Sequence, residues 1–297
     1  MLNGSALLTD YFKTACISQK GLRYYNIHLG VAFNPDLQKR AETTPLPDTA
    51  MGGYDVFIFG FDSLSRMAWL RNLPKTREFF TRVLGGIELE GHNVLGDGTV
   101  QALLPLLAGR TEQDLPTARR GERGSVFVDS FPWIWRKFKD AGYVTAWGED
   151  MANIGTFQMR LNGFVNQPVD HYMRTYFLAA EPMYHRFKPF CVGSEPRHIR
   201  FFNYFRDLYQ MYGAKRKFMF GFHSECSHQD NNYLKKLDSD FTEFLRELQD
   251  SGYLNHTILI LMGDHGARFS YVRATQQGKM EERMPLFSFA FPPGFTT

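Results

Sequence analysis

The chain has 297 residues, of which 43% are hydrophobic, so it can bury a substantial core as one large or two ordinary domains. Its net charge of +3 is close to balanced and its basic residues are spread along the chain, which predicts no nucleic-acid partner. No apolar stretch approaches the roughly 20 residues of a membrane span, so we expect no span within this chain. The opening residues lack the basic start and the long apolar centre of a signal peptide.

From residue 54 onward, apolar runs and turn residues predict strands that alternate with helices. A strand over 54–61 ends at Asp62 and is followed by short helices separated by Pro74. A second strand is expected over 87–94, and the next helix should begin at Thr99 after a glycine-rich turn. Three side chains after Pro74 are expected to face the core: Phe79, Phe80 and Val83.

The middle of the chain continues this alternation. A helix with Pro132 in its first turn leads to a strand over 143–147, which is followed by Glu149 and Asp150. Residues 167–196 are rich in proline and aromatic side chains, and we interpret them as a long surface excursion that could shape a substrate pocket.

Two further strands complete the predicted sheet. The first covers 217–222, and the amphipathic helix after it has apolar side chains at spacings of three and four. The last apolar run, 258–262, is typical of a buried parallel strand. This alternation predicts an α/β fold, with a largely parallel central sheet covered by helices on both faces.

Polar side chains cluster where the predicted strands end and helices begin. Asp62, Thr99, residues 223–228, Asp264 and His265 all fall at such junctions. Open α/β sheets bind ligands at the carboxyl ends of their strands, and carboxylate and imidazole groups suit Zn²⁺ or Mn²⁺. Each group alone could be a capping Asp, an N-cap Thr or a surface His, but their convergence favours a metal site.

The chemistry of such a site would centre on Thr99. A divalent ion on its hydroxyl, at the positive end of a helix, would favour the alkoxide at neutral pH and make it a nucleophile. His228 and His223 are candidates for a second metal ion or for contacting a phosphoryl oxygen. The predicted ligands of the first ion are Asp62, Thr99, Asp264 and His265.

Three motifs support a family resemblance. The Phe-Asp-Ser-Leu-Ser-Arg run at 61–66, the segment 98–110 ending in Leu-Leu-Ala-Gly-Arg, and Gly-Asp-His-Gly at 263–266 resemble the sulfatase-like branch of the alkaline phosphatase superfamily. With the Ser-His pair at 227–228 and the Glu-Glu-Arg-Met-Pro run at 281–285, the chain is most similar to an animal family called domain of unknown function 229.

The resemblance implies the superfamily's central sheet with one or two metal ions. It matches Asp62, Asp264 and His265 to the ligands of the first ion and Thr99 to the nucleophile. It implies a sulfatase-like catalytic domain over 54–297, C-terminally incomplete, after an N-terminal extension over 1–53. Two further residues are candidates for a second metal ion or for substrate binding: Arg66 and Glu225.

Departures from the sulfatase pattern limit the classes of ester on which the site could act. Sulfatases have a second aspartate where Ser63 stands, an arginine where Leu103 stands, and a modified cysteine where Thr99 stands. The threonine makes a formylglycine sulfatase improbable and favours phosphate or phosphonate esters, as in the threonine-using phosphodiesterases and lipoteichoic-acid synthases of this superfamily. Because Ser224 stands four residues before His228, where two-metal members carry an aspartate, one metal site is expected and a second stays open.

These inferences predict a metal-dependent hydrolase or transferase with Zn²⁺ or Mn²⁺, or alternatively Ca²⁺. The expected substrate is a phosphorylated small molecule, lipid or glycan, and the resemblance implies an extracellular or secretory location. The alternative hypothesis is a non-catalytic extracellular binding protein that keeps the sulfatase-like scaffold, because the arginine and second aspartate are missing.

Overall fold

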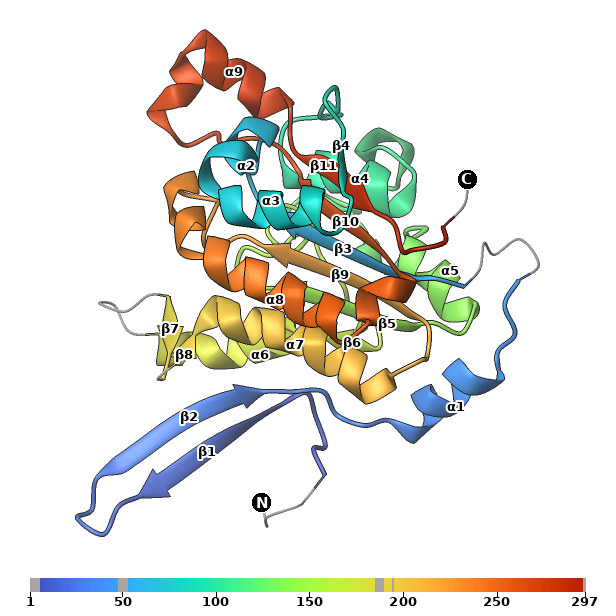
Figure 1. The fold of residues 1–297 in the computed structure, drawn as a ribbon, viewed down its shortest axis with the longest axis vertical. Helices are drawn as coiled ribbons and strands as arrows, with labels where there is room; N and C mark the ends of the chain where they lie inside the picture. The colour runs from blue at the N-terminus through green and yellow to red at the C-terminus, as the bar shows by residue number, and fades with distance from the viewer. Residues whose placement is uncertain (1–5, 48–52, 185–189, 194, 296–297) are drawn as a thin grey trace.

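The structure, a computed structural model, describes residues 6–47, 53–184, 190–193 and 195–295 (Figure 1). Parts of the expected N-terminal extension, residues 1–5 and 48–52, therefore lie outside the described residues. The strands are β1 (Tyr11–Ile17), β2 (Arg23–Leu29), β3 (Asp55–Phe61), β4 (Ile87–Glu88), β5 (Val144–Glu149), β6 (His171–Tyr172), β7 (Cys191–Val192), β8 (Glu195–Pro196), β9 (Lys217–His223), β10 (Thr257–Gly263) and β11 (Phe287–Ala290). The α-helices are α1 (Pro35–Thr43), α2 (Arg66–Asn72), α3 (Pro74–Arg82), α4 (Thr99–Ala108), α5 (Ile134–Asp140), α6 (Arg174–Ala180), α7 (Arg197–Tyr212), α8 (Asp238–Asp250) and α9 (Gln276–Arg283).

The core of the molecule is a 7-stranded sheet with the order β4-β11-β10-β3-β9-β5-β6. The strands from β10 to β6 run parallel to one another, whereas β11 is antiparallel to β10 and β4 is antiparallel to β11. This arrangement confirms the predicted α/β fold with a largely parallel sheet. The strand expected over 87–94 is short, because β4 is an edge strand that pairs with β11 only at Ile87 and Glu88.

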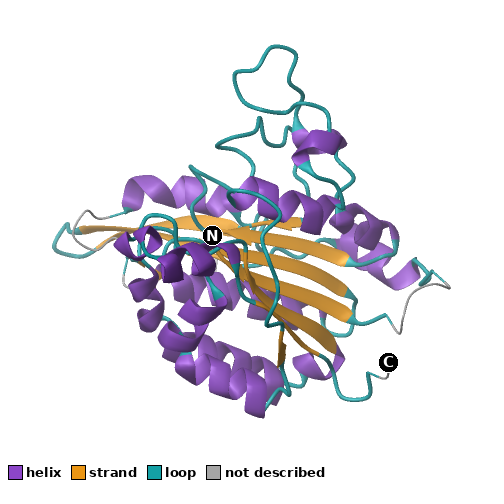
Figure 2. Ribbon diagram, turned by 90° about the horizontal axis from the view of Figure 1, so that it is seen from above, coloured by secondary structure: helices purple, strands orange, loops and turns teal. Residues whose placement is uncertain are grey.

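Both faces of the sheet are covered by helices, as Figure 2 shows. Strand β3 explains this, since Phe57, Phe59 and Phe61 pack with α2, α3, α6, α7 and α8, while Ile58 belongs to the opposite cluster with α4 and α5. Alternate side chains of a strand point to opposite faces, so a strand buried on both sides is apolar throughout. Burial of the central strands on both faces therefore explains the continuous apolar runs in the sequence.

Tertiary packing overrides some local predictions. Residues around α6 are not a surface excursion, because Tyr176 and Phe177 are 1% exposed and join the main core. Val83 is 59% exposed, since α3 ends at Arg82 and its side chain turns away from the core. Pro132 precedes the helix that it was expected to start, because the buried Trp133 remains extended as the N-cap of α5.

The N-terminal hairpin β1–β2 lies beside α7 (Figure 1). The carboxylate of Asp10 contacts His171 Nδ1 at 2.9 Å and accepts a hydrogen bond of 3.1 Å from the Tyr204 hydroxyl. Arg200, on α7, donates to the carbonyl oxygen of Ile27 in β2. Among the described residues, no helix is both long and apolar enough to cross a membrane.

Candidate active site

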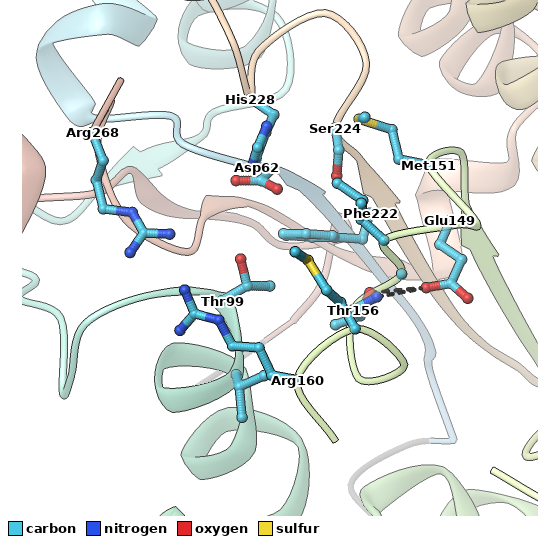
Figure 3. A pocket seen from close by; sticks show the side chains of 14 residues that line it. Asp62, Thr99, Glu149, Met151, Thr156, Arg160, Phe222, Ser224, His228 and Arg268 are labelled. Carbon is cyan, nitrogen blue, oxygen red and sulfur yellow. Dashed lines mark hydrogen bonds between the residues drawn. The ribbon is translucent and has the colours of Figure 1, made fainter. Parts of the chain in front are cut away.

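The carboxyl ends of the central parallel strands meet at one edge of the sheet. Asp62 follows β3, Asp264 follows β10, His223 ends β9 and Glu149 ends β5, while α4 begins at the same edge with Thr99. These elements surround an open pocket of about 550 Å³, shown in Figure 3. Residues far apart in the sequence therefore come together where parallel sheets bind ligands.

Asp62, Asp264 and His265 form a buried cluster whose possible ligand atoms all lie within 4.8 Å of one another. The Nε2 atom of His265 is 3.2 Å from Asp264 Oδ2 and 3.9 Å from Asp62 Oδ1. The three residues are at most 4% exposed. The structure thus brings the predicted aspartate and histidine ligands together.

The chemistry of this cluster fits a divalent cation. His265 Nδ1 lies 2.9 Å from the carbonyl oxygen of Gly266, which can only accept, so Nδ1 carries the proton and the Nε2 of a neutral ring presents a lone pair to the carboxylates. Asp264 Oδ2 and His265 Nε2 are buried, and neither has a hydrogen-bond partner among the described residues. Burial, and then the charge of Asp264, raise the pKa of Asp62 well above its ordinary value. An ion such as Zn²⁺ or Mn²⁺ would satisfy all three groups.

A tight turn after β3 orients both carboxylates. Ser63 has a φ of 64°, and among the described residues it is the one non-glycine residue with a positive φ. Its backbone N–H donates to Asp264 Oδ1 at 2.9 Å, and its hydroxyl donates to Asp62 Oδ1 at 2.9 Å. Strained backbone of this kind is concentrated at functional sites. Ser63, which stands where sulfatases have an aspartate, therefore supports the ligands through hydrogen bonds.

Glycine is required before Asp264. A Cβ at Gly263 would lie 2.0 Å from the carbonyl oxygen of Leu64, so any side chain would push the end of β10 away from the turn after β3. The close approach of these two backbones is what brings Asp264 next to Asp62.

Thr99 is the first residue of α4, and Gly98 is the N-cap without a side-chain hydrogen bond. The alternative reading of Thr99 as an N-cap is therefore wrong. Figure 3 shows the Thr99 hydroxyl directed into the pocket, below the carboxylate of Asp62. Leu103, one turn later, is fully buried in the core, which explains why this helix carries no arginine there.

His228 lines the same pocket and comes from the turn after β9. Burial lowers the pKa of His228, so the ring is neutral at pH 7. The side-chain amide of Gln229 lies 3.1 Å from Nδ1 and can donate to it, which leaves the proton of the neutral ring on Nε2. His228 can then donate a hydrogen bond within the pocket.

His223 and Glu225 lie apart from the pocket, in a buried cluster with Cys226. Burial lowers the pKa of His223 to about 4 and raises the pKa of Glu225 to about 8. Glu225 forms an ion pair with the guanidinium group of Arg197, and His223 Nε2 lies 3.3 Å from Asp150 Oδ2. Arg197 already supplies a positive charge beside Glu225, and a second metal ion at this cluster stays a prediction.

Arg66 also lies outside the pocket. It is the first residue of α2, and its guanidinium group is 3.2 Å from Glu90 and 3.9 Å from Glu88. The structure therefore does not bring it to Thr99.

The sequence reasoning missed Arg160 and Arg268, which both line the pocket and whose guanidinium groups lie on one side of Thr99 in Figure 3. Arg268 follows the Gly-Asp-His-Gly motif within two residues, a signal that could have indicated it. Arg160 lies in an irregular loop, and no motif near it in the sequence indicates that it lines a site. Glu149 holds this loop, because its carboxylate accepts hydrogen bonds from the backbone N–H and the hydroxyl of Thr156.

Comparisons with known proteins agree with this architecture. The structure of a protein in the alkaline phosphatase superfamily from Vibrio parahaemolyticus is similar with a TM-score of 0.56 and 16% identity, covering 87% of this chain and 68% of that one. The zinc complex of the C-terminal periplasmic domain of EcEptC from Escherichia coli has a TM-score of 0.54 and 11% identity, covering 84% and 77%. The phosphonate monoester hydrolase SpPMH from Silicibacter pomeroyi has a TM-score of 0.55 and 12% identity, covering 81% and 68%.

At these identities the structural likeness establishes the fold. No curated protein is similar to the chain in sequence. The profile of the family described as "Protein of unknown function (DUF229)" matches residues 6–297, nearly the whole chain. The chain therefore belongs to the DUF229 family and has the fold of the alkaline phosphatase superfamily.

Proposed function

We propose that the protein is a metal-dependent hydrolase or transferase that acts on phosphate or phosphonate esters with Thr99 as its nucleophile. One observation carries this proposal: Asp62, which lines the same pocket as Thr99, belongs to the buried cluster in which ligand atoms of Asp264 and His265 have no hydrogen-bond partner among the described residues. The similar fold of a phosphonate monoester hydrolase supports the reaction class. Asp62, Asp264 and His265 would hold the metal ion, with Zn²⁺ or Mn²⁺ favoured by the imidazole ligand.

The reaction would proceed in two displacements. The Thr99 oxygen attacks phosphorus, the bond to the ester oxygen breaks, and the alcohol leaves with a proton, so that a phosphothreonine remains on the chain. Water or an acceptor hydroxyl then takes the phosphoryl group and restores Thr99. When bound, the divalent ion supplies positive charge that lowers the pKa of the threonine hydroxyl and offsets charge on the phosphoryl group.

Residues around Thr99 have separate tasks in this scheme. The free amides at the start of α4 face the same space as the Thr99 hydroxyl and favour negative charge there. His228 is placed to donate a hydrogen bond from Nε2 to a phosphoryl oxygen. The turn at Ser63 holds the ligand carboxylates, so that binding the metal needs little rearrangement.

The test is to trap the intermediate. Turnover of an aryl phosphate by the metal-loaded chain, quenched in acid, should leave about 80 additional mass units on the peptide that contains Thr99, the mass of one added phosphoryl group. Thr99→Ala should abolish both the adduct and turnover. Full turnover by a folded Thr99→Ala protein would end the nucleophile proposal, and less than about a tenth of an equivalent of bound metal would sink the enzyme assignment and favour a binding protein.

The wider setting is also a proposal. We infer that residues 54–297 form the catalytic unit behind an N-terminal extension, and that it works in the secretory pathway or outside the cell on a phosphorylated small molecule, lipid or glycan. The structure similar to it from Escherichia coli is a periplasmic domain, which supports this location. Fractionation of cells that express the protein should find it in secretory compartments or the medium, and a purely cytosolic pool would contradict the proposal.

A further inference from the structure

Two arginine side chains from separate loops converge beside Thr99. A Cβ atom at Gly98 would lie 2.9 Å from Arg160 Nη1 and 3.2 Å from Arg268 Nη1. Both guanidinium groups are therefore packed against the one residue that precedes Thr99. Figure 3 shows both guanidinium groups on the same side of the pocket, beside Thr99.

This arrangement leaves an excess of positive charge. The Asp97 carboxylate accepts from Arg268 Nη1 at 2.9 Å, and the Asp97 backbone carbonyl accepts from Arg160 Nη1 at 3.4 Å. Among the described residues, Asp97 is the one acidic side chain within 4.0 Å of either guanidinium group. Its side chain is 80% exposed, so water screens its charge.

Two further features mark the position as a binding site for an anion. Arg268 Nε is buried and has no hydrogen-bond partner among the described residues, and the Arg268 side chain is only 13% exposed. The amides at the start of α4 have no side-chain cap, because Gly98 is the N-cap. Guanidinium groups and free helix amides together bind the oxygens of tetrahedral anions.

We propose that Arg160 and Arg268 bind the non-bridging oxygens of the phosphoryl group at Thr99 and select phosphate monoesters over diesters, an inference that rests on the proposed function. A monoester carries close to two negative charges at neutral pH and has three non-bridging oxygens. A diester carries one charge and has two such oxygens. Two guanidinium groups therefore stabilise the monoester more, and their planar forks match its oxygens better than lysine would.

The experiment compares 4-nitrophenyl phosphate with methyl 4-nitrophenyl phosphate, which share a leaving group, on the metal-loaded chain. The wild type should prefer the monoester. Arg160→Met, Arg268→Met and the double variant should lose monoester kcat/KM, by about 100-fold or more in the double variant, while diester kcat/KM falls less than about 5-fold. The matched control is Arg82→Met, because Arg82 pairs with the exposed Glu78 at 2.9 Å on α3 and lines neither this pocket nor the one beside Gly98; it should change either value less than about 2-fold.

A second measurement separates this inference from the proposed function. Inorganic phosphate should bind the metal-loaded wild type at least about 10-fold more tightly than the double variant in calorimetry. If the wild type hydrolyses neither ester, the proposed function fails, and phosphate affinity alone decides the role of the arginines. Unchanged phosphate affinity, equal loss on both esters, or a wild-type preference for the diester would each overturn the proposal. Arg160 is exposed, so Arg160→Met is expected to fold. This single variant therefore tests the proposal even if the double variant does not fold.

Discussion

A buried aspartate lies at each end of strand β3, and the charges of the groups around the two aspartates differ. At the amino end, Asp55 Oδ2 is 3.1 Å from the ammonium group of Lys217, and Asp55 Oδ1 accepts a 2.7 Å hydrogen bond from the Lys217 backbone. The ammonium group also donates to the carbonyl oxygens of Gly213 and Lys215. At the carboxyl end, Asp62 instead faces the carboxylate of Asp264 and the imidazole of His265.

The two aspartates therefore differ in role: Asp55 forms an ion pair that stabilises the fold, whereas Asp62 belongs to the proposed metal site. Burial raises the pKa of Asp55 and lowers the pKa of Lys217, but the two charges offset each other. Among the described residues, no lysine or arginine forms an ion pair with the carboxylates at the carboxyl end, where we propose that a metal ion binds. Lys217 is 1% exposed and serves as the counter-ion of Asp55.

The largest effect is expected from Asp264→Asn. This change removes one charged ligand atom and should lower metal affinity by more than about 100-fold, since even the loss of outer partners of metal ligands costs 10- to 100-fold. Turnover should fall with it, while the metal-free protein unfolds at the same urea concentration as the wild type or a higher one. Metal titration and urea unfolding measure both quantities, and unfolding of the variant with metal still bound would make Asp264 a structural residue.

At the amino end, Lys217→Met should lower the stability of the fold and leave metal affinity unchanged. Asp55 would be left as a buried charge without its counter-ion, which should lower the free energy of unfolding by about 3–5 kcal/mol. Turnover per folded, metal-loaded molecule should not change. Adding Asp55→Asn should recover much of the loss, because a neutral amide can still accept from the Lys217 backbone. Equal destabilisation of the single and double variants would show that packing, and not charge, matters there.

A smaller effect is expected for Asp170, which also lies near the amino end of the sheet. Burial opposes its ionisation, but hydrogen bonds from Arg40 and Thr145 and the charge of Arg40 prevail and lower the pKa of Asp170 to about 2. A carboxyl group with a lowered pKa stabilises the fold above its unfolded pKa of about 4 and loses this contribution as the pH falls through about 2. Asp170→Asn should therefore cost about 2 kcal/mol at pH 7.

The pH dependence provides the check. The difference in unfolding free energy between the wild type and Asp170→Asn should be constant from pH 7 to 5 and shrink below about pH 4. The control is Asp140→Asn, which removes a carboxylate from an exposed position at the end of α5. A gap that does not change with pH would mean that hydrogen bonding, rather than ionisation, accounts for the contribution of Asp170.

The smallest effect is expected from Thr99→Ser at the carboxyl end. Serine keeps the nucleophilic oxygen and loses one methyl group, so turnover should stay within about 10-fold of the wild type. The acid-quenched adduct should then appear as phosphoserine on the same peptide. Turnover that persists with no adduct at this position would indicate direct attack by water.

Much of the fold could be predicted from local pattern. The apolar runs of β3 and β10 and the start of α4 at Thr99 follow from side-chain periodicity and turn residues, which act between near neighbours in the chain. The same signals indicated Asp62 and Asp264, because the carboxyl ends of parallel strands share one edge. Local pattern is therefore enough to predict the sheet and the junctions where ligands would lie.

The tertiary structure alone decided which polar side chains reach the pocket. Arg160 comes from an irregular loop and meets Arg268 only because both pack against Gly98. His223 ends the same kind of strand as its neighbours, yet its ring packs 5.2 Å from that of Phe201 and does not join the cluster of Asp62, Asp264 and His265. Local periodicity does not predict such contacts, since they depend on how separate helices, strands and loops pack against one another.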